Sequence, residues 1–290
     1  MTDSELQKPE PFEHQLLGEL RSLNETLQEL RGRLVAQEKR TEQIRHATAF
    51  PVQNGYFRKI VQHQLGYLET VEMVSRRRLS LARFGDGEIT LACHAYQNIK
   101  FQKGSPELSR ALQDVLSADR PGLLTAMPGL IVDTTWLTLF ARYWGVLEEV
   151  LPETKLWGSS SVSRKSAFTY HGKEIVDAWR SCWAGREITI VTGKGSRFEP
   201  IDQLFSGAKS LDFVYGPASN AFESIDAIQA EILSRERDLV LLSLGPAATV
   251  LAARLSDLGL QAIDVGHISN SYLQAFDGGP SPESLPVEKR

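Results

Sequence analysis

Leucine residues in the N-terminal part of the chain recur at alternating spacings of four and three residues. The series comprises Leu16, Leu20, Leu23, Leu27, Leu30 and Leu34, and Gln37, Thr41 and Ile44 continue it in phase. This 3.5-residue period predicts a helix over residues 1–50 with one narrow apolar stripe. The stripe could pack on the chain's own globular part, but its persistence over about four heptads favours a coiled coil between copies of the chain. Leucine at both core positions leaves the number of strands open.

Apolar runs and helical periods alternate from residue 51 to about residue 270. The apolar runs predict strands at 80–84, 122–126, 187–191, 211–215, 239–244 and 261–265. The helical periods predict helices at 61–77, 106–118, 133–150, 173–183, 224–234 and 247–258. Several strands end in a glycine-containing loop that a helix follows. This pattern predicts an α/β fold with a Rossmann-like, mostly parallel sheet and flanking helices, whose ligands bind beyond the carboxyl ends of the strands.

Two segments frame this region. Residues 47–54 contain Pro51 and lead into Asn54-Gly55, which predicts a hinge between the heptad helix and the globular part. The end of the chain, from Ser269, is rich in Gly, Pro, Ser and Glu, which predicts a flexible tail over residues 271–290.

Composition narrows the class of protein. The formal net charge of −4 argues against a nucleic-acid-binding role, which usually shows as a basic face. Cys93 and Cys182 lie far apart, so neither a disulfide framework nor a zinc site is expected. The N-terminus lacks the apolar segment of a signal peptide, and no apolar run is long enough to span a membrane. We therefore expect a cytoplasmic protein, with peripheral association at the inner membrane left open.

Two carboxylates follow the first predicted strand. Asp86 and Glu88 are separated and preceded by glycines, Gly85 and Gly87. In an extended backbone, residues two apart point the same way, so both acids could reach one hard cation such as Mn²⁺ or Mg²⁺. Such an ion could neutralise a pyrophosphate leaving group. The alternative is an exposed turn, because Asp and Gly are common turn residues.

The loop after the predicted strand at 187–191 combines glycine with basic residues. Gly193, Lys194 and Arg197 suit a phosphate, because backbone N–H groups and fixed cations bind anions together. Phe198 stands where a dinucleotide fingerprint requires its third glycine, so a Rossmann cofactor site is not expected. A solvated basic loop is the alternative.

Three further loops carry polar side chains, and two of them, at Asn220 and His267, follow predicted strands at the same edge of the sheet. Asn220 could orient a nucleoside or cap the helix that follows. His267 could be a third metal ligand or a catalytic acid, or a hydrogen-bonded structural residue. The segment Ser163-Arg164-Lys165 could bind a second phosphate or an acceptor, or form a surface turn.

Together these segments resemble the GT-D-fold glycosyltransferases, a bacterial family. The resemblance runs from about Leu79 to about His267. Its best segments are Ala82-Arg83-Phe84-Gly85-Asp86-Gly87-Glu88, Gly193-Lys194-Gly195-Ser196-Arg197-Phe198, Asn220-Ala221-Phe222, Leu244-Gly245-Pro246 and Ile263-Asp264-Val265-Gly266-His267. The resemblance implies that Asp86 and Glu88 hold the divalent metal of a bound nucleoside diphosphate. Family members continue past the Gly-His pair with an acidic residue, where this chain has Ser269.

We therefore expect a metal-dependent glycosyltransferase that transfers a sugar from a nucleotide-sugar donor, a UDP-sugar, to a glycan or glycoprotein acceptor in bacterial surface biosynthesis. Arg83, Lys194 and Arg197 would add positive potential, Asn220 would orient the nucleoside, and His267 would contact the metal. The alternatives are a metal-dependent nucleotide phosphohydrolase and a non-catalytic nucleotide-binding scaffold assembled by the coiled coil.

Overall fold

The computed structural model describes residues 12–129 and 133–285 of the 290-residue chain. The chain divides into two compact units at Pro51 and Val52, and each unit is considered by itself. None of the described helices has an apolar stretch of the length needed to cross a membrane.

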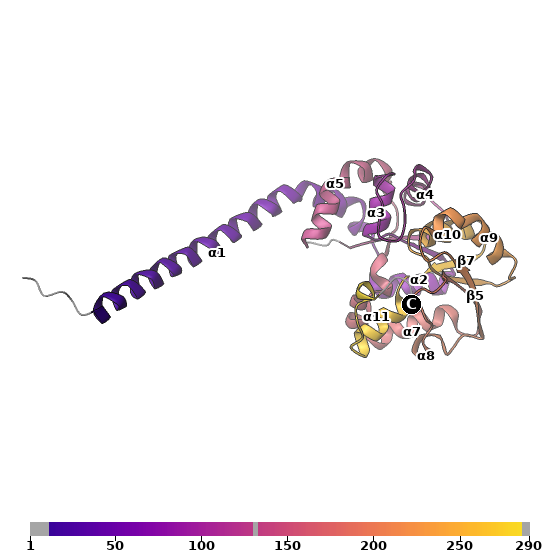
Figure 1. The fold of residues 1–290 in the computed structure, drawn as a ribbon. Coiled ribbons are helices and arrows are strands. Elements are labelled where there is room, and N and C mark those ends of the chain that lie inside the picture. Colours follow the sequence, from indigo (N-terminus) through magenta and orange to yellow (C-terminus); the bar gives the residue numbers. More distant parts are fainter. Residues whose placement is uncertain (1–11, 130–132, 286–290) are drawn as a thin grey trace, which may run out of the picture. The chain divides into compact units, whose positions relative to one another are not determined.

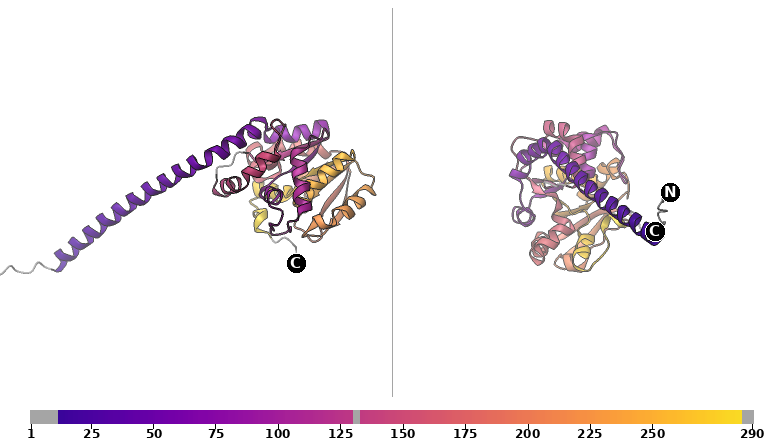
Figure 2. Two further views of the ribbon diagram at one scale, coloured as in Figure 1. Left: turned by 90° about the horizontal axis from the view of Figure 1, so that it is seen from above. Right: turned by 90° about the vertical axis from the view of Figure 1, so that its left-hand side faces the viewer.

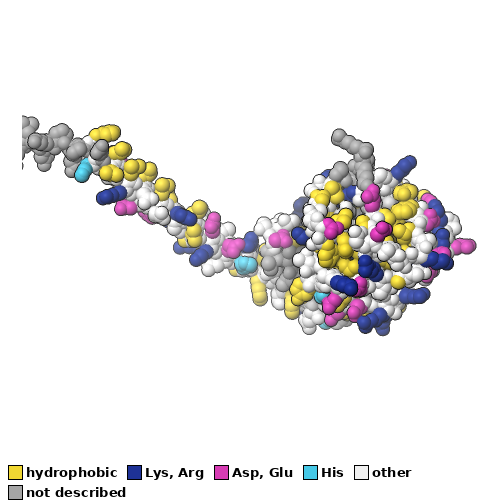
Figure 3. Space-filling view, turned by 90° about the horizontal axis from the view of Figure 1, so that it is seen from below, with side chains coloured by type: hydrophobic (Ala, Val, Ile, Leu, Met, Phe, Trp, Pro, Cys, Tyr) yellow, Lys and Arg dark blue, Asp and Glu magenta, His cyan; other side chains and the backbone are white. Residues whose placement is uncertain are grey.

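The first unit is built on helix α1, which runs from Phe12 to Lys59 as one continuous ribbon (Figure 2). The segment predicted as a hinge, residues 47–54, is helical, and the division between the two units falls within it, after Pro51. Hydrophobic side chains follow one another along the helix surface (Figure 3). The six heptad leucines, Leu16 to Leu34, are 44–59% exposed, so their apolar stripe is accessible to solvent.

The second unit contains a parallel sheet. Within the described residues, seven strands pair in the order β3-β2-β1-β7-β6-β4-β5. Their bounds are β1 Ser80–Arg83, β2 Leu123–Met127, β3 Gly158–Ser159, β4 Glu187–Gly193, β5 Ser210–Gly216, β6 Leu239–Ser243 and β7 Gln261–Asp264. All the pairings are parallel, which confirms the predicted α/β sheet.

The order of the strands decides where a ligand can bind. The chain builds the sheet outward from β1 to β3 and later returns to place β7 on the other side of β1. A second reversal lies at β4, which has β5 on one side and β6 on the other. Crevices form beyond the carboxyl ends of parallel strands at such reversals, because the connecting helices leave on opposite faces.

Helices cover both faces of the sheet (Figure 1). One apolar core is covered by α3 Asp86–Cys93, α4 Pro106–Ser117, α5 Thr134–Val150, α9 Ile225–Leu233 and α10 Pro246–Asp257. The other is covered by α2 Tyr67–Arg77, α6 Lys165–His171, α7 Lys173–Trp183, α8 Asp202–Phe205 and α11 Ile268–Phe276. Adjacent strand residues alternate between the cores: Leu241 belongs to the second core and Leu242 to the first, as a pleated strand buried on both faces requires.

The structure corrects three predicted elements. The helix expected over 61–77 is a 3₁₀ turn, Val61–His63, followed by α2 from Tyr67. The new start is fixed by Glu69, whose carboxylate accepts a hydrogen bond from the Gly66 N–H at 2.9 Å. Asp86 and Glu88, predicted to lie on an extended backbone, lie instead in the first turn of α3.

The predicted flexible tail is the third correction. Residues Ile268–Phe276 form α11, and Pro282–Ser284 form a 3₁₀ turn, η4. Ser269 and Ser271 are buried, and Tyr272 packs against the second core, so this segment is part of the fold. Residues 286–290 lie outside the described part of the chain.

Gly245, in the loop between β6 and α10, has a backbone conformation and a packing environment that favour glycine. Its φ is +56°, and a Cβ there would lie 2.5 Å from the Phe101 ring. We expect Gly245→Ala to lower the free energy of unfolding by about 1–2 kcal/mol, measured by urea unfolding. The control is Gly145→Ala in α5, where a Cβ meets no atom within 4 Å. It should raise stability by about 0.5–1 kcal/mol. A Gly245→Ala protein as stable as wild type would contradict the packing described here.

Candidate active site

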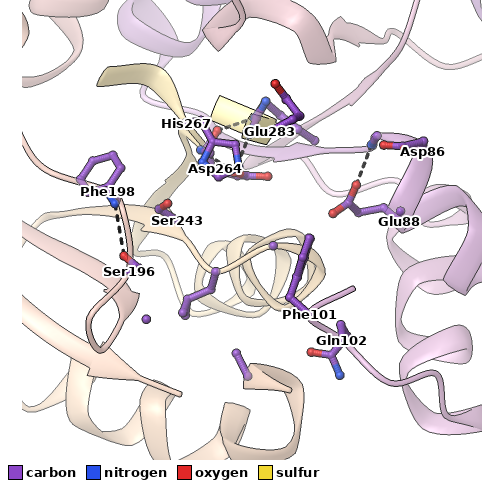
Figure 4. Close-up of a pocket in the computed structure, with 18 of the residues that line it drawn as sticks. Asp86, Glu88, Phe101, Gln102, Ser196, Phe198, Ser243, Asp264, His267 and Glu283 are labelled. Carbon is purple, nitrogen blue, oxygen red and sulfur yellow. Dashed lines mark hydrogen bonds and ion pairs between the residues drawn. The ribbon is translucent and has the colours of Figure 1, made fainter. Parts of the chain in front are cut away.

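A pocket of about 320 Å³ opens at the carboxyl ends of the central strands (Figure 4). It lies where both reversals of strand order occur, since β1, β4, β6 and β7 or their following loops all line it. The polar lining includes Arg83, Asp86, Glu88, Ser160, Arg164, Ser196, Arg197, Ser243, Asp264, His267 and Glu283. The predicted clustering of strand-end loops on one rim is therefore present.

The floor of the pocket is organised by a buried ion pair. Arg83, the last residue of β1, contacts Asp264, the last residue of β7: Nη2 to Oδ1 is 2.9 Å, and Nε donates to the Asp264 carbonyl at 2.7 Å. Arg83 Nη1 donates to the Ser160 carbonyl at 3.0 Å, and the Gly266 N–H donates to Asp264 Oδ1 at 3.0 Å. The Arg83 charge, predicted to serve a phosphate, is thus largely neutralised by an internal partner.

Asp264 lies in a segment that resembles the family, but the sequence did not identify it as a site residue. It ends a buried strand and is only 5% exposed. Buried carboxylates require a partner, and that partner, Arg83, is about 180 residues away along the chain. The signal in the sequence was an acidic residue at the end of a predicted buried strand.

Asp86 and Glu88 both line the pocket, but their geometry differs from the prediction. They are the first and third residues of helix α3. Residues two apart on a helix are turned by about 200° about its axis, so the alternation of a strand does not align these carboxylates. Glu88 Oε2 accepts the Gly85 N–H at 2.8 Å and so helps to cap the helix (Figure 4). Asp86 is exposed.

Glu88 lies in an environment that disfavours its charge. Burial raises the pKa of its carboxyl from 4.5 to about 7, and the negative charge of Asp264 adds to the effect. Hydrogen bonds from backbone N–H groups and the charge of Arg83 act in the opposite direction. The carboxyl of Glu88 is therefore only partly ionised at pH 7.

His267 lies on the other, basic side of the pocket. Its Nε2 accepts a hydrogen bond from Arg197 Nη2 at 3.0 Å. Burial and the nearby charges of Arg197, Arg164 and Arg83 lower the pKa of His267 to about 3, so its ring is neutral at pH 7. Surrounded by guanidinium groups, His267 is poorly placed for a cation, contrary to its predicted role as a metal ligand.

No group of three or more His, Cys, Asp or Glu side chains in the described ranges is arranged to hold a metal ion. The predicted set of Asp86, Glu88 and His267 is therefore not assembled as one cluster. Asp86 and Glu88 remain as two oxygen donors on the same side of the pocket.

The basic side is formed by Arg164 and Arg197. Arg164 Nη1 contacts Glu283 Oε1 at 2.5 Å, and Arg197 Nη1 donates to the Leu285 carbonyl at 2.9 Å. The pKa of Glu283 falls to about 2: its partial burial opposes this shift, but the Ser281 hydroxyl, its own backbone N–H and Arg164 outweigh it. Of the segment Ser163-Arg164-Lys165, only Arg164 lines the pocket.

Two predicted site residues lie outside the pocket lining, namely Lys194 and Asn220. Lys194 is exposed. Asn220, at φ 56°, accepts the Lys103 N–H on Oδ1 at 2.9 Å and donates its own N–H to the Phe101 carbonyl at 2.8 Å. It therefore positions the loop of Phe101, which does line the pocket.

Gly193 lines the pocket as expected, at the end of β4. A Cβ at this position would lie 2.7 Å from the Ala218 Cα, so glycine permits the close approach of the two loops. The apolar part of the lining, Phe84, Phe101, Trp136, Phe198 and Leu244, was not identified from the sequence. Aromatic residues at such spacings are indistinguishable from core residues without the fold.

Comparison with known proteins shows which family the chain is similar to. A family model described as glycosyltransferase GT-D fold matches residues 81–278. The chain is 31% identical over 225 residues to glycosyltransferase GlyD of Streptococcus pneumoniae, and 27% identical over 221 residues to the probable glycosyl transferase Gly of Streptococcus gordonii. These matches cover 71% and 70% of this chain but only 27% and 32% of those proteins, so the chain spans about a third or less of their lengths.

Solved structures agree with the sequence comparisons. A structure of domain of unknown function 1792, described as having a distinct glycosyltransferase fold, matches with a TM-score of 0.68 at 27% identity, covering 80% of this chain and 86% of that one. A glycosyltransferase of the same domain type from Streptococcus sanguinis matches with a TM-score of 0.65 at 25% identity, covering 74% and 85%. The family model matches well over half of the chain, and the chain belongs to the GT-D-fold glycosyltransferase family.

Proposed function

We propose that this chain transfers a sugar from a nucleotide-activated donor, a UDP-sugar, to a glycan or glycoprotein acceptor. The observation that carries the proposal is the pocket at the junction of β1 and β7, which has carboxylates on one side and guanidinium groups on the other. A sugar nucleotide needs both kinds of group. Its diphosphate is anionic, and its departure is accelerated by charges fixed around it before the reaction.

A divalent ion, Mn²⁺ or Mg²⁺, would be held by Asp86 and Glu88. Mg²⁺ is usually bound through one or two carboxylates plus the phosphates of a substrate, so two protein ligands suffice. The fit is supported by Glu88, because a cation beside it would stabilise the ionised carboxylate that burial and the charge of Asp264 disfavour. When bound, the ion would neutralise the charge that develops on the leaving diphosphate.

The rest of the lining suits the rest of the donor. Phe101 and Trp136 give the pocket an apolar wall on which a nucleobase can pack. Arg197, held by His267 and Leu285, places a fixed positive charge at the pocket. Asp264 keeps Arg83 oriented and does not need to contact the substrate.

We place this reaction in the synthesis of bacterial surface polysaccharide or glycoprotein glycans, with the enzyme on the cytoplasmic side of the membrane. The glycosyltransferase names of its streptococcal relatives support the sugar transfer itself.

We also propose that the first unit joins copies of the chain through α1. Its heptad leucines are exposed along one stripe, and a second copy would bury them.

The test of the metal site is titration of UDP with and without Mn²⁺. We expect Asp86→Asn with Glu88→Gln to reduce the Mn²⁺-dependent affinity for UDP by at least about tenfold, since charge-assisted contacts to the ion are lost. The control is Glu149→Gln, which removes a charge from an exposed position of α5. UDP binding that is independent of metal and unchanged in the double variant would contradict the proposal. Assays of the wild type for transferred sugar and for inorganic phosphate separate a transferase from a phosphohydrolase.

The raised pKa of Glu88 also predicts that the free energy of unfolding depends on pH. Its carboxyl loses its proton near pH 4.5 in the unfolded chain and near pH 7 in the folded one. The folded state therefore binds more protons between these values, and stability falls as the pH rises through this window. Glutamine cannot ionise, so Glu88→Gln should gain about 2–3 kcal/mol relative to wild type between pH 5 and pH 8. Urea unfolding in EDTA at both pH values measures this difference. An equal difference at both would show that the folded-state pKa of Glu88 is not raised.

The proposed self-association is tested with Leu27→Lys, which puts a charge in the centre of the heptad stripe. We expect this variant to sediment as a species of lower mass than wild type, because a lysine in the core of a coiled coil is costly to bury. Glu25→Gln lies off the stripe and should leave the mass unchanged. A wild-type protein that is monomeric at micromolar concentration would contradict the proposal.

A further inference from the structure

The basic side of the pocket is occupied by a group from the chain itself. Glu283, in η4, directs its carboxylate to Arg164, with Oε1 and Nη1 2.5 Å apart. Its negative charge also acts on Arg197 and His267. Figure 4 shows Glu283 beside His267 and Asp264, across the pocket from Asp86 and Glu88. An anion therefore already lies among the positive charges of the site.

Two contacts join the segment that carries Glu283 to these arginines. Arg164 binds the Glu283 carboxylate, and Arg197 donates to the Leu285 carbonyl at 2.9 Å. Ser281 shapes the turn, since its hydroxyl accepts the Glu283 N–H at 3.3 Å. Arg164 and Arg197 are thus shared between the pocket and the C-terminal segment.

At Arg164, another anion can replace the carboxylate of Glu283. The side chains of Arg164 and Glu283 are 41% and 63% exposed, so water screens their attraction and the pair is weak. The buried pair Arg83–Asp264, at 11% and 7% exposure, is a fixed element by comparison. A diphosphate has more charge and more acceptor oxygens than a single carboxylate, and guanidinium groups bind phosphate oxygens in pairs.

We propose that Arg164 and Arg197 form the subsite for the diphosphate of the nucleotide donor, and that Glu283 occupies this subsite as an internal competing anion when the donor is absent. Donor binding displaces the Glu283 carboxylate from Arg164. The identity of the ligand rests on the proposed function, whereas the anion site itself rests on the contacts described here.

The test is calorimetric titration of inorganic pyrophosphate in EDTA at low salt, which requires neither metal nor catalysis. Removing the competing charge with Glu283→Gln should tighten pyrophosphate binding about two- to fivefold, the range expected for loss of an exposed ion pair. Glu149→Gln makes the same charge change on α5 and should leave the affinity unchanged. Equal affinities for wild type and Glu283→Gln would overturn the proposal.

Two further titrations show where pyrophosphate binds. Arg164→Gln should weaken pyrophosphate binding, and in the Arg164→Gln background Glu283→Gln should give a smaller gain, because its contact with Arg164 is lost while its charge still acts on Arg197. A full gain in that background would show that Glu283 does not compete at Arg164. With Mn²⁺ in place of EDTA, UDP should displace pyrophosphate from the Glu283→Gln protein. If it does not, the anion site is separate from the donor site, and the diphosphate assignment is wrong even if the anion site is real.

Discussion

The ion pair between Arg83 and Asp264 is the interaction on which the site depends. It joins the last residues of β1 and β7, the strands that meet where the chain reverses its direction across the sheet. The carbonyl of Ser160 accepts from the same guanidinium group, which attaches the loop that leads to Arg164. Gly266 follows at φ +49°, where a Cβ would lie 2.1 Å from the Arg83 side chain. The carboxyl ends of the sheet are thereby held at fixed positions around the pocket.

This pairing leaves the two sides of the pocket with opposite charge. Because Arg83 and Asp264 largely neutralise each other, Asp86 and Glu88 define an acidic side, and Arg164 and Arg197 define a basic one. The raised pKa of Glu88 and the lowered pKa of His267 have the same two causes, burial first and then nearby charge of the same sign as the ionised group, Asp264 for Glu88 and Arg197 for His267. A cation bound on the acidic side would lower the pKa of Glu88, and an anion bound on the basic side would raise the pKa of His267.

The sheet was predictable because its strands are apolar runs that end at glycine or polar loops, as at Leu239–Ser243. The site was only partly predictable, because the local sequence is compatible with two different backbone structures. Asp86 and Glu88 suit an extended strand end, but Glu88 caps Gly85 and the segment becomes a helix. Asp264 and Glu283 gain their roles from partners more than 100 residues away, Arg83 and Arg164, and no local pattern reports such pairs.

The most direct test of the donor site is a crystal structure with UDP and Mn²⁺, using the anomalous signal of manganese to place the ion. The account predicts an anomalous peak about 2.0–2.3 Å from an oxygen of Asp86 or Glu88 and in contact with the diphosphate, with the uracil ring against Phe101 or Trp136. A peak remote from both carboxylates, or UDP bound outside the β1–β7 junction, would contradict it.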